Sequence, residues 1–344
     1  MTQAVVVDTH VHVMKTFAGF CGRGAVWSAS NGEVAFSTGE RESVMPASFV
    51  DTSFPMEMAE RYMREAQVDY CVLMQATFYG LLNEYVSQCC ASSSMVLGGC
   101  ACLDPYAKYW AEILTRCVDE LGLCAVKFEM SEDYGLTGLH PDMRLNDSRF
   151  DAFWDRLAAA QVPFVLDPGW SGGLGNRPSD IREVLDRHPG LSVVVAHLGQ
   201  PSEGVARAGA AGLAELGRVP RDVVESDSSW MSWLELGKRE GVYFDLAILH
   251  RFGRLEEYPY PAAQEFVRIA RDSVGPEKLM WASDLPYPLL MATYSQSVDW
   301  VRVHCDYLTD GDRSLILGSN AMRVFGQAAG ARGKRMADVA GEAT

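Results

Sequence analysis

Short apolar runs recur along the chain, and longer segments with helical periodicity lie between them. The first run, residues 4–12, reads Ala-Val-Val-Val-Asp-Thr-His-Val-His. Seven further runs are rich in β-branched residues and have the length of buried strands. They span residues 70–75, 95–102, 123–130, 163–167, 191–197, 242–247 and 278–284. The pattern therefore predicts eight strands.

Most of the intervening segments have the apolar spacing of amphipathic helices. They are residues 55–66, 106–121, 149–161, 178–188, 262–274 and 294–307. Regular strand–helix alternation is typical of a parallel sheet, and eight units favour a closed (β/α)8 TIM barrel. A doubly wound open sheet is the alternative, but its Gly-x-Gly-x-x-Gly turn is missing after the first run. We therefore expect a single α/β barrel domain over residues 1–327.

Two long segments depart from this alternation. Residues 17–54 are rich in Gly, Ser and Thr, lack a helical period and are too long for an ordinary loop. Because they follow directly after His12 and contain apolar residues such as Phe17 and Trp27, we expect an insertion over the mouth of the barrel. Residues 199–237 are the second departure. The small and polar residues 328–344 are expected to form a flexible tail.

Composition narrows the classes of partner. The 344 residues are 48% hydrophobic and 22% charged, with a net charge of −15. This charge argues against nucleic acid and anionic membranes as partners, and a small-molecule substrate is expected instead. No run approaches the roughly 18 apolar residues of a membrane helix, and no signal-type segment opens the chain. A homodimer is one assembly compatible with the sequence.

The cysteines indicate a compartment. There are nine, an odd number, and most lie inside apolar runs, as in Tyr70-Cys-Val-Leu. Buried free thiols of this kind are typical of a reducing environment. We therefore expect a cytoplasmic protein.

Ionisable residues lie at the ends of the predicted strands. His10 and His12 are separated by one residue, so strand alternation places both imidazoles on one face, where they can grip a divalent ion. The alternative is two unrelated histidines at a strand end. Later runs end in further ionisable groups, namely Lys127, Glu129, Asp167, His197 and Asp284. Burying so many unpaired groups at one barrel mouth would cost several kcal/mol each, whereas a bound metal makes the placement favourable.

Four motifs together resemble a known family. They are Asp8-Thr-His-Val-His12, Ala196-His-Leu-Gly199, Ala282-Ser-Asp-Leu-Pro286 and Leu317-Gly-Ser-Asn-Ala321. In this order they are similar to the amidohydrolase superfamily, and most similar to its amidohydrolase-2 branch, over residues 4 to about 326. That branch contains metal-dependent hydrolases, decarboxylases of the aminocarboxymuconate-semialdehyde and resorcylate types, and a lactonase that works without metal.

The resemblance implies a role for each matching residue. His10, His12 and Asp284 match metal ligands. Asp284 also matches the group that exchanges a proton with the attacking water, and His197 matches the histidine that assists or polarises the substrate. Taken singly, Asp284 would more often be a helix cap and His197 a buried structural histidine.

The fifth run departs from the family pattern. It ends in Asp167-Pro-Gly, where the family usually has a ligand histidine. Asp167 can itself ligate through oxygen, or Glu129 can complete the ligand set, as a carboxylate does in other branches of the superfamily. Lys127 shares a face with Glu129 and would then hold a substrate carboxylate. A local Lys127–Glu129 ion pair and a carbamylated Lys127 are the alternatives.

These residues predict a metal-dependent hydrolase acting on a small carboxylated or aromatic ester, lactone or amide. One divalent ion is expected, zinc first and manganese or iron otherwise. The alternatives are a metal-dependent decarboxylase of a hydroxybenzoate-like acid and a catalytically inactive binding barrel. Hydrolysis ranks first because the negative charge of Asp167 would weaken the attraction of the ion for a substrate carboxylate. Beyond these residues, His250 could reach the pocket from a loop.

Overall fold

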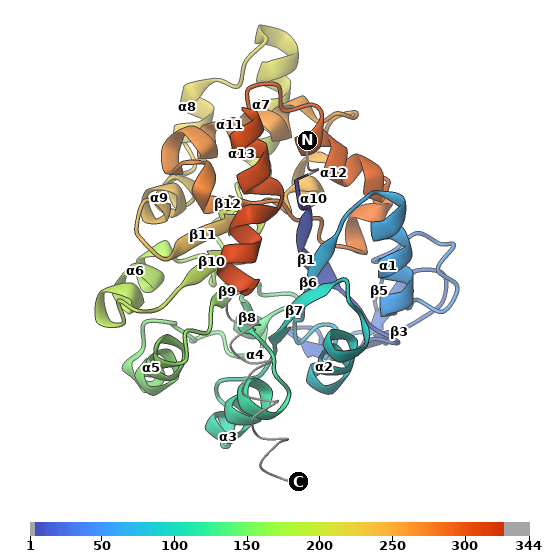
Figure 1. Ribbon diagram of the computed structural model, residues 1–344, viewed down its shortest axis with the longest axis vertical. Coiled ribbons are helices and arrows are strands. Elements are labelled where there is room, and N and C mark those ends of the chain that lie inside the picture. The colour runs from blue at the N-terminus through green and yellow to red at the C-terminus, as the bar shows by residue number, and fades with distance from the viewer. Residues whose placement is uncertain (1–3, 327–344) are drawn as a thin grey trace.

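The computed structural model describes residues 4–326 and contains eight parallel strands arranged as a barrel (Figure 1). Each strand pairs with the next one along the chain. In order they are β1 Val7–His12, β6 Tyr70–Met74, β7 Val96–Ala101, β8 Ala125–Glu129, β9 Phe164–Asp167, β10 Val193–Val195, β11 Val242–Asp245 and β12 Leu279–Met280. The eight predicted strands and the (β/α)8 fold class are confirmed.

The barrel closes where the chain beyond β12 returns to β1. Val11 forms a parallel bridge with Leu285, and the Asp284 amide donates to the His10 carbonyl at 2.8 Å. Asp8 strengthens this seam because its Oδ1 accepts from the Ser283 amide at 2.9 Å. The closure therefore brings the first and last strand ends, and the ionisable groups they carry, side by side.

Helices lie between the strands at the predicted places. They are α1 Met56–Glu65, α3 Trp110–Thr115 with a π-helical continuation Arg116–Glu120, α5 Asp151–Ala159, α6 Pro178–Arg187, α11 Pro261–Val274 and α12 Tyr294–Arg302. Helix α2 Asn83–Ser92 was not predicted. Residues 199–237 form α7 Glu203–Leu216, α8 Arg221–Glu225 and α9 Ser228–Gly237. The glycines that obscured α7 in the sequence serve packing, since a Cβ at Gly209 would lie 2.8 Å from the Phe266 ring.

One face of every strand points into the barrel. A compact interior cluster takes side chains from seven strands, including Val7, Cys100, Ala125, Val165 and Val194. In β8 and β9 the residues that continue this face toward the carboxyl end are charged. Because alternate residues of a strand share a face, the face that is apolar inside the barrel becomes polar at the mouth.

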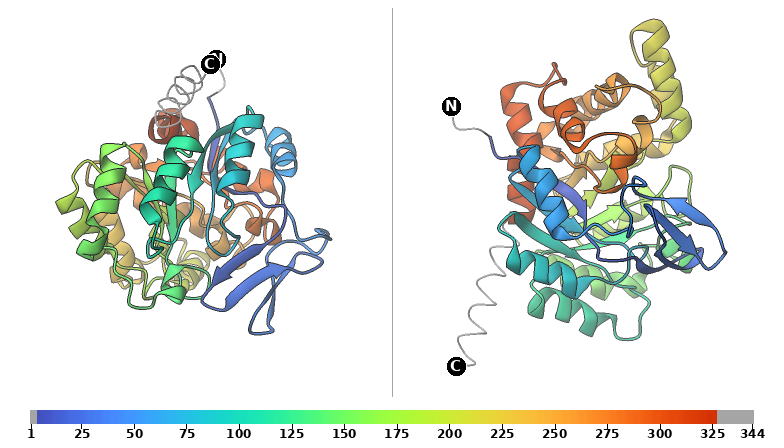
Figure 2. Two further views of the ribbon diagram at one scale, coloured as in Figure 1. Left: turned by 90° about the horizontal axis from the view of Figure 1, so that it is seen from below. Right: turned by 90° about the vertical axis from the view of Figure 1, so that its right-hand side faces the viewer.

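Residues 17–54 form a small antiparallel sheet, whereas the sequence predicted a loop. Its strands are β2 Ala18–Cys21, β3 Gly24–Ser28, β4 Glu33–Phe36 and β5 Arg41–Ser43, paired in that order. The hairpin signal was Asn31-Gly32, both at positive φ between β3 and β4. Figure 2 shows this sheet, in dark blue, at the end of the barrel away from the start of β1. It lies at the carboxyl ends of the strands, where the Phe20 amide donates to the Thr77 carbonyl.

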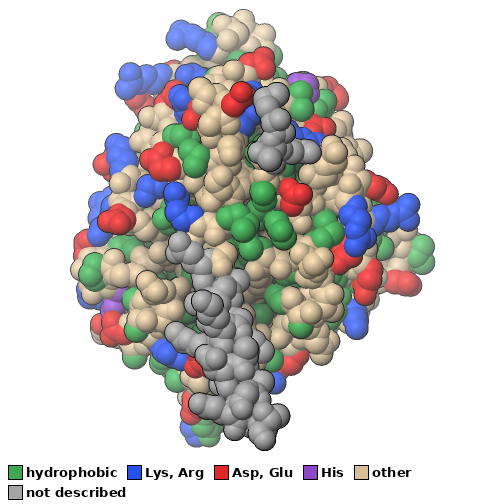
Figure 3. Space-filling view, viewed as in Figure 1, with side chains coloured by type: hydrophobic (Ala, Val, Ile, Leu, Met, Phe, Trp, Pro, Cys, Tyr) green, Lys and Arg blue, Asp and Glu red, His purple; other side chains and the backbone are tan. Residues whose placement is uncertain are grey.

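The remaining expectations concern the surface, the thiols and the tail. Acidic and basic side chains are interspersed over the face seen in Figure 3. Eight of the nine cysteines are buried, as the apolar runs around most of them predicted, and Cys90 is half-buried. Within residues 4–326, no helix has the length and apolar character needed to cross a membrane. The predicted flexible tail, 328–344, lies outside the described residues.

Candidate active site

A pocket at the carboxyl ends of the strands collects most of the predicted residues. His12, Lys127, Glu129, Asp167, His197 and Asp284 all line it. His10 lies directly behind, with its Nε2 atom 3.2 Å from Nε2 of His12. The small sheet contributes Glu42 and the residue after its last strand, Val44. The aromatic part of the lining consists of Phe78, Tyr79, Tyr134, Trp170 and Tyr287.

The first wall of this pocket consists of His10, His12 and Asp284. Oδ1 of Asp284 lies 3.7 Å from Nε2 of His10 and 3.5 Å from Nε2 of His12. Two ligands of a tetrahedral ion at about 2.0–2.1 Å lie roughly 3.3–3.4 Å apart, so these three separations fit one shared divalent ion. A set of two imidazole nitrogens and one carboxylate oxygen suits zinc, manganese or iron.

The two histidines of the first wall are neutral. Burial, with a contribution from the charge of Lys127, lowers the pKa of His10 to about 4, and the same two causes hold the pKa of His12 well below its usual range. Nδ1 of His10 lies 2.8 Å from Oδ2 of Asp245, the last residue of β11. Nδ1 therefore carries the proton, and Nε2 keeps a lone pair, from which Nζ of Lys127 lies 2.8 Å away. Burial raises the pKa of Asp284 to about 7.

The second wall consists of Asp167, His197 and Gln200. Nε2 of His197 lies 3.1 Å from Oδ2 of Asp167, and its Nδ1 lies 2.8 Å from the Ala247 carbonyl. The other oxygen of Asp167 accepts from Nε2 of Gln200 at 3.2 Å and from the Gly169 amide at 3.0 Å. Both ring nitrogens of His197 thus face acceptors, so both donate.

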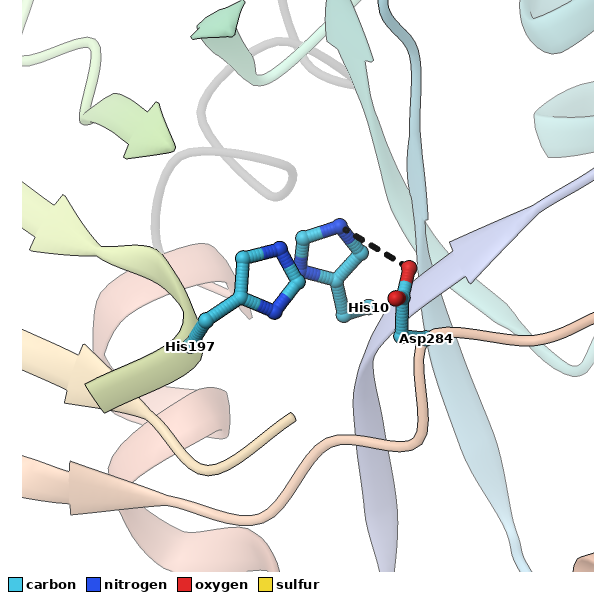
Figure 4. A group of neighbouring side chains, drawn as sticks. All are labelled: His10, His197 and Asp284. Atoms are coloured by element: carbon cyan, nitrogen blue, oxygen red, sulfur yellow. Dashed lines mark ion pairs between the residues drawn. The ribbon is translucent and has the colours of Figure 1, made fainter. Parts of the chain in front are cut away.

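The charges of this second wall follow from that bonding. Burial by itself would lower the pKa of His197, but the charge and hydrogen bond of Asp167 outweigh it and raise the pKa to about 9. Burial would raise the pKa of Asp167, but the same pairing with His197 holds it well below its usual range. Donor atoms of His10, His197 and Asp284 lie within 4.8 Å of one another (Figure 4). A doubly donating imidazolium, however, offers no lone pair to an ion.

Both walls are held by strained backbone. His197 has a φ of 55° and Asp284 a φ of 69°, values that cost of order 1–3 kcal/mol for residues other than glycine. Asp245 holds the His197 backbone because its Oδ1 accepts from the His197 amide at 2.7 Å. One carboxylate thus fixes His10 through its ring and His197 through its backbone. The strain places each side chain at the mouth instead of along its strand.

Lys127 and Glu129 lie between the walls. Nζ of Lys127 lies 2.8 Å from Nε2 of His10, and among the described residues it forms no ion pair with Glu129. Glu129 accepts from the Ser131 hydroxyl and is not in the group of His10, His197 and Asp284. Burial, together with the charge of Asp167, raises the pKa of Glu129 to about 8. The structure therefore brings Glu129 into the pocket but beside Asp167, away from the histidine pair.

Asp245 and Gln200 were missed by the sequence analysis. Asp245 has the signal used elsewhere, a carboxylate that ends a buried strand, because it follows Val242-Tyr-Phe. Gln200 had no such signal, since it acts from a left-handed turn after β10 with a φ of 59°. His250, a predicted alternative, does line the pocket. Trp230 and Trp233 are fully buried and donate to the Leu198 carbonyl and to Asn176.

Comparison with known proteins supports the family that the sequence motifs resemble. Residues 7–327 match the family described as Amidohydrolase. Among curated proteins, no match was found. A zinc-bound amidohydrolase from Burkholderia multivorans has a TM-score of 0.66 at 16% identity, covering 94% of this chain and 99% of that one.

Two further solved structures represent different reactions on this fold. A putative 2-pyrone-4,6-dicarboxylic acid hydrolase from Pseudomonas putida has a TM-score of 0.62 at 18% identity, covering 94% of this chain and 98% of that one. The 5-carboxyvanillate decarboxylase from Sphingomonas paucimobilis has a TM-score of 0.59 at 15% identity, covering 94% and 99%. At these identities the likeness establishes the fold, and the family match establishes membership. The resemblance predicted from the motifs is thus confirmed, and this chain belongs to the amidohydrolase family.

Proposed function

We propose that this protein is a metal-dependent hydrolase of a small carboxylated or aromatic ester, lactone or amide. The observation that carries the proposal is the position of Asp284, whose Oδ1 lies within 3.7 Å of two neutral imidazole nitrogens. A carboxylate has two oxygens, so one can face an ion while the other exchanges a proton with water. On the opposite wall, His197 supplies a positive charge that is fixed in place by Asp167 and the Ala247 carbonyl.

His10, His12 and Asp284 would hold one divalent ion, with zinc as the first choice. When bound, such an ion supplies a Lewis acid that polarises a carbonyl group and lowers the pKa of a nearby water. The neutral state of both histidines favours this role because a protonated imidazole cannot ligate. Asp245 orients His10 for it through the 2.8 Å contact to Nδ1.

The protein groups would then move one proton and stabilise one charge. Asp284 takes a proton from the attacking water as the water oxygen bonds to the carbonyl carbon. The positive charge of His197, held in place by Asp167 and the Ala247 carbonyl, stabilises the oxygen on which negative charge develops. Asp284 returns the proton to the leaving oxygen or nitrogen as the carbon–heteroatom bond breaks. Strain and buried hydrogen bonds keep both groups in place before the substrate arrives.

In this proposal Asp167 has a different role from the one that the sequence predicted. Its charge was expected to weaken the attraction of the ion for a carboxylate, which favoured hydrolysis. The pairing with His197 compensates that charge, so this argument loses force. Hydrolysis now rests on the combination of Asp284 on the first wall with the fixed cationic side chain of His197 on the opposite wall.

A second reaction is supported by Glu129. This carboxyl group lines the pocket beside Asp167, a position from which it can protonate a ring carbon after carbon dioxide leaves. The decarboxylase of a hydroxybenzoate-like acid therefore stays the alternative.

The test combines metal analysis with product identification. We expect about one divalent ion per purified chain, and loss of turnover after chelation with recovery on adding zinc, manganese or iron. A panel of aryl esters, lactones, anilides and hydroxybenzoates is then followed for acid release and for carbon dioxide. Acid release without carbon dioxide is the expected result. Carbon dioxide from a hydroxybenzoate would establish the alternative, and chelator-insensitive turnover without metal would refute the metal-dependent mechanism.

A further inference from the structure

Arg251 is a largely buried arginine at the edge of the pocket that forms no ion pair with a carboxylate of residues 4–326. It belongs to the short helix α10 Leu249–Phe252, which follows β11. Its Nε atom is buried without a hydrogen-bond partner. Burial lowers the pKa of Arg251 to about 10, which reflects a desolvated charge that is poorly compensated. Buried charges in proteins are normally paired, so this guanidinium requires an explanation.

The contacts of Arg251 place it against the pocket. Its guanidinium carbon lies 3.7 Å from the centroid of the Trp170 ring, and its Nη2 donates to Oε1 of Gln200 at 3.2 Å. Trp170 and Gln200 both line the pocket. Stacking uses one face of the guanidinium and the Gln200 contact uses one of its five N–H groups. Donors remain for a further acceptor.

The acidic side chains whose charges act most strongly on Arg251 already have other partners. Glu203 pairs with Arg207 at 2.7 Å. Asp227 accepts from the Ser202 amide at 2.7 Å and from the Ser171 hydroxyl at 2.8 Å. Asp167 is paired with His197. Among the described residues, these three acidic side chains therefore act on Arg251 through their charge, but none of them forms an ion pair with it.

The other carboxylates of the pocket do not oppose an anion. Glu42 is neutralised by Arg23, whose Nη2 lies 2.8 Å from it, and it also accepts from the Tyr134 hydroxyl at 2.8 Å. Asp284 faces the histidine pair on the first wall, and burial raises the pKa of Glu129 to about 8, so that this carboxyl group carries little charge at neutral pH. An anionic group at Arg251 would thus meet the guanidinium with no unpaired charged carboxylate beside it.

We infer that Arg251 binds a carboxylate of the substrate, so that the natural substrate is an anion with its carboxylate remote from the bond that is cleaved. This inference rests on the proposed function only in taking the bound anion to be the substrate. The carboxylate would lie on the Trp170 side of the pocket, and the reacting carbonyl near Asp284. Planar guanidinium–carboxylate pairing also fixes the orientation of the bound molecule.

The test measures binding without turnover. Isophthalate carries two carboxylates, and isophthalamide replaces both of them by neutral amides of similar shape. Calorimetric titration of the purified protein should give at least about tenfold tighter binding of isophthalate, in line with a charge-assisted pair. Arg251→Met should weaken the binding of isophthalate about tenfold or more and leave that of isophthalamide nearly unchanged, and Arg251→Lys should restore part of the preference.

The matched control is Arg254→Met, which removes an exposed arginine three residues away in the same loop. It should keep the preference for isophthalate. Equal binding of the two ligands to the unaltered protein, no binding of isophthalate to it, or an unchanged preference in Arg251→Met would overturn the inference. Failure of the proposed function would instead appear as chelator-insensitive turnover or carbon dioxide release, neither of which changes the ligand preference.

Discussion

The two walls of the pocket use the same residue types for different purposes. The first wall has two histidines and an aspartate, and the second has one histidine, an aspartate and a glutamine. In the first, Nδ1 of His10 faces a carboxylate and Nε2 lies at the pocket with a lone pair. In the second, the carboxylate of Asp167 faces Nε2 of His197 and a carbonyl faces Nδ1.

This difference shows that an imidazole is assigned its role by its hydrogen-bond partners. A histidine with one carboxylate behind it can act as a metal ligand, because its outer nitrogen stays unprotonated. A histidine whose two nitrogens both face acceptors is a cationic donor. His10 and His197 have ring centroids only 4.9 Å apart, yet their pKa values are shifted in opposite directions.

The largest effect should follow from breaking the first wall. His10→Ala removes one of the two nitrogen donors, so the variant should lose its bound metal and at least about a thousandfold in kcat/KM. Elemental analysis and steady-state kinetics measure the two losses. The control is His140→Ala, because His140 lies outside the pocket, where it pairs with Asp104. A His10→Ala protein that keeps its metal would show that the first wall is not the ligand set.

A smaller effect is expected on the second wall. His197→Asn removes the cationic donor but no ligand, so kcat should fall by about 10²–10³ while the metal content stays unchanged. Loss of the metal in this variant would mean that His197 ligates, and that the contrast between the walls is wrong.

The smallest of the three effects should come from the partner of that donor. Asp167→Asn leaves a neutral amide beside His197, so kcat should fall by about 10-fold, with a shifted pH profile and unchanged metal affinity. The shifted profile separates this from a purely structural role, since Asp167 also accepts from the Gly169 amide. Unchanged turnover and pH profile would reduce Asp167 to a cap of the turn after β9.

Much of the fold could be predicted because barrel periodicity is local. Each strand was recognisable from its own β-branched run, and its polar end from the last residues of that run. The small sheet was not recognised, because its strands are three to five residues long and are interrupted by glycines. Helix α7 was missed for a related reason, since Gly209 and Gly212 are required by close contact with Phe266 and Pro220 although glycine has a low helix propensity.

The sequence by itself determined which ionisable groups stand at the barrel mouth, since strand order and alternation follow from neighbouring residues. Only the tertiary structure decided which of them pair. His10 meets Asp245 across 235 positions of the chain, and His197 meets Asp167 across 30. The sequence likewise could not predict that the buried guanidinium of Arg251 forms no ion pair with a carboxylate of residues 4–326. Protonation and role depend on such partners because a buried imidazole or guanidinium responds to the charges within a few ångströms of it, whichever strand supplies them.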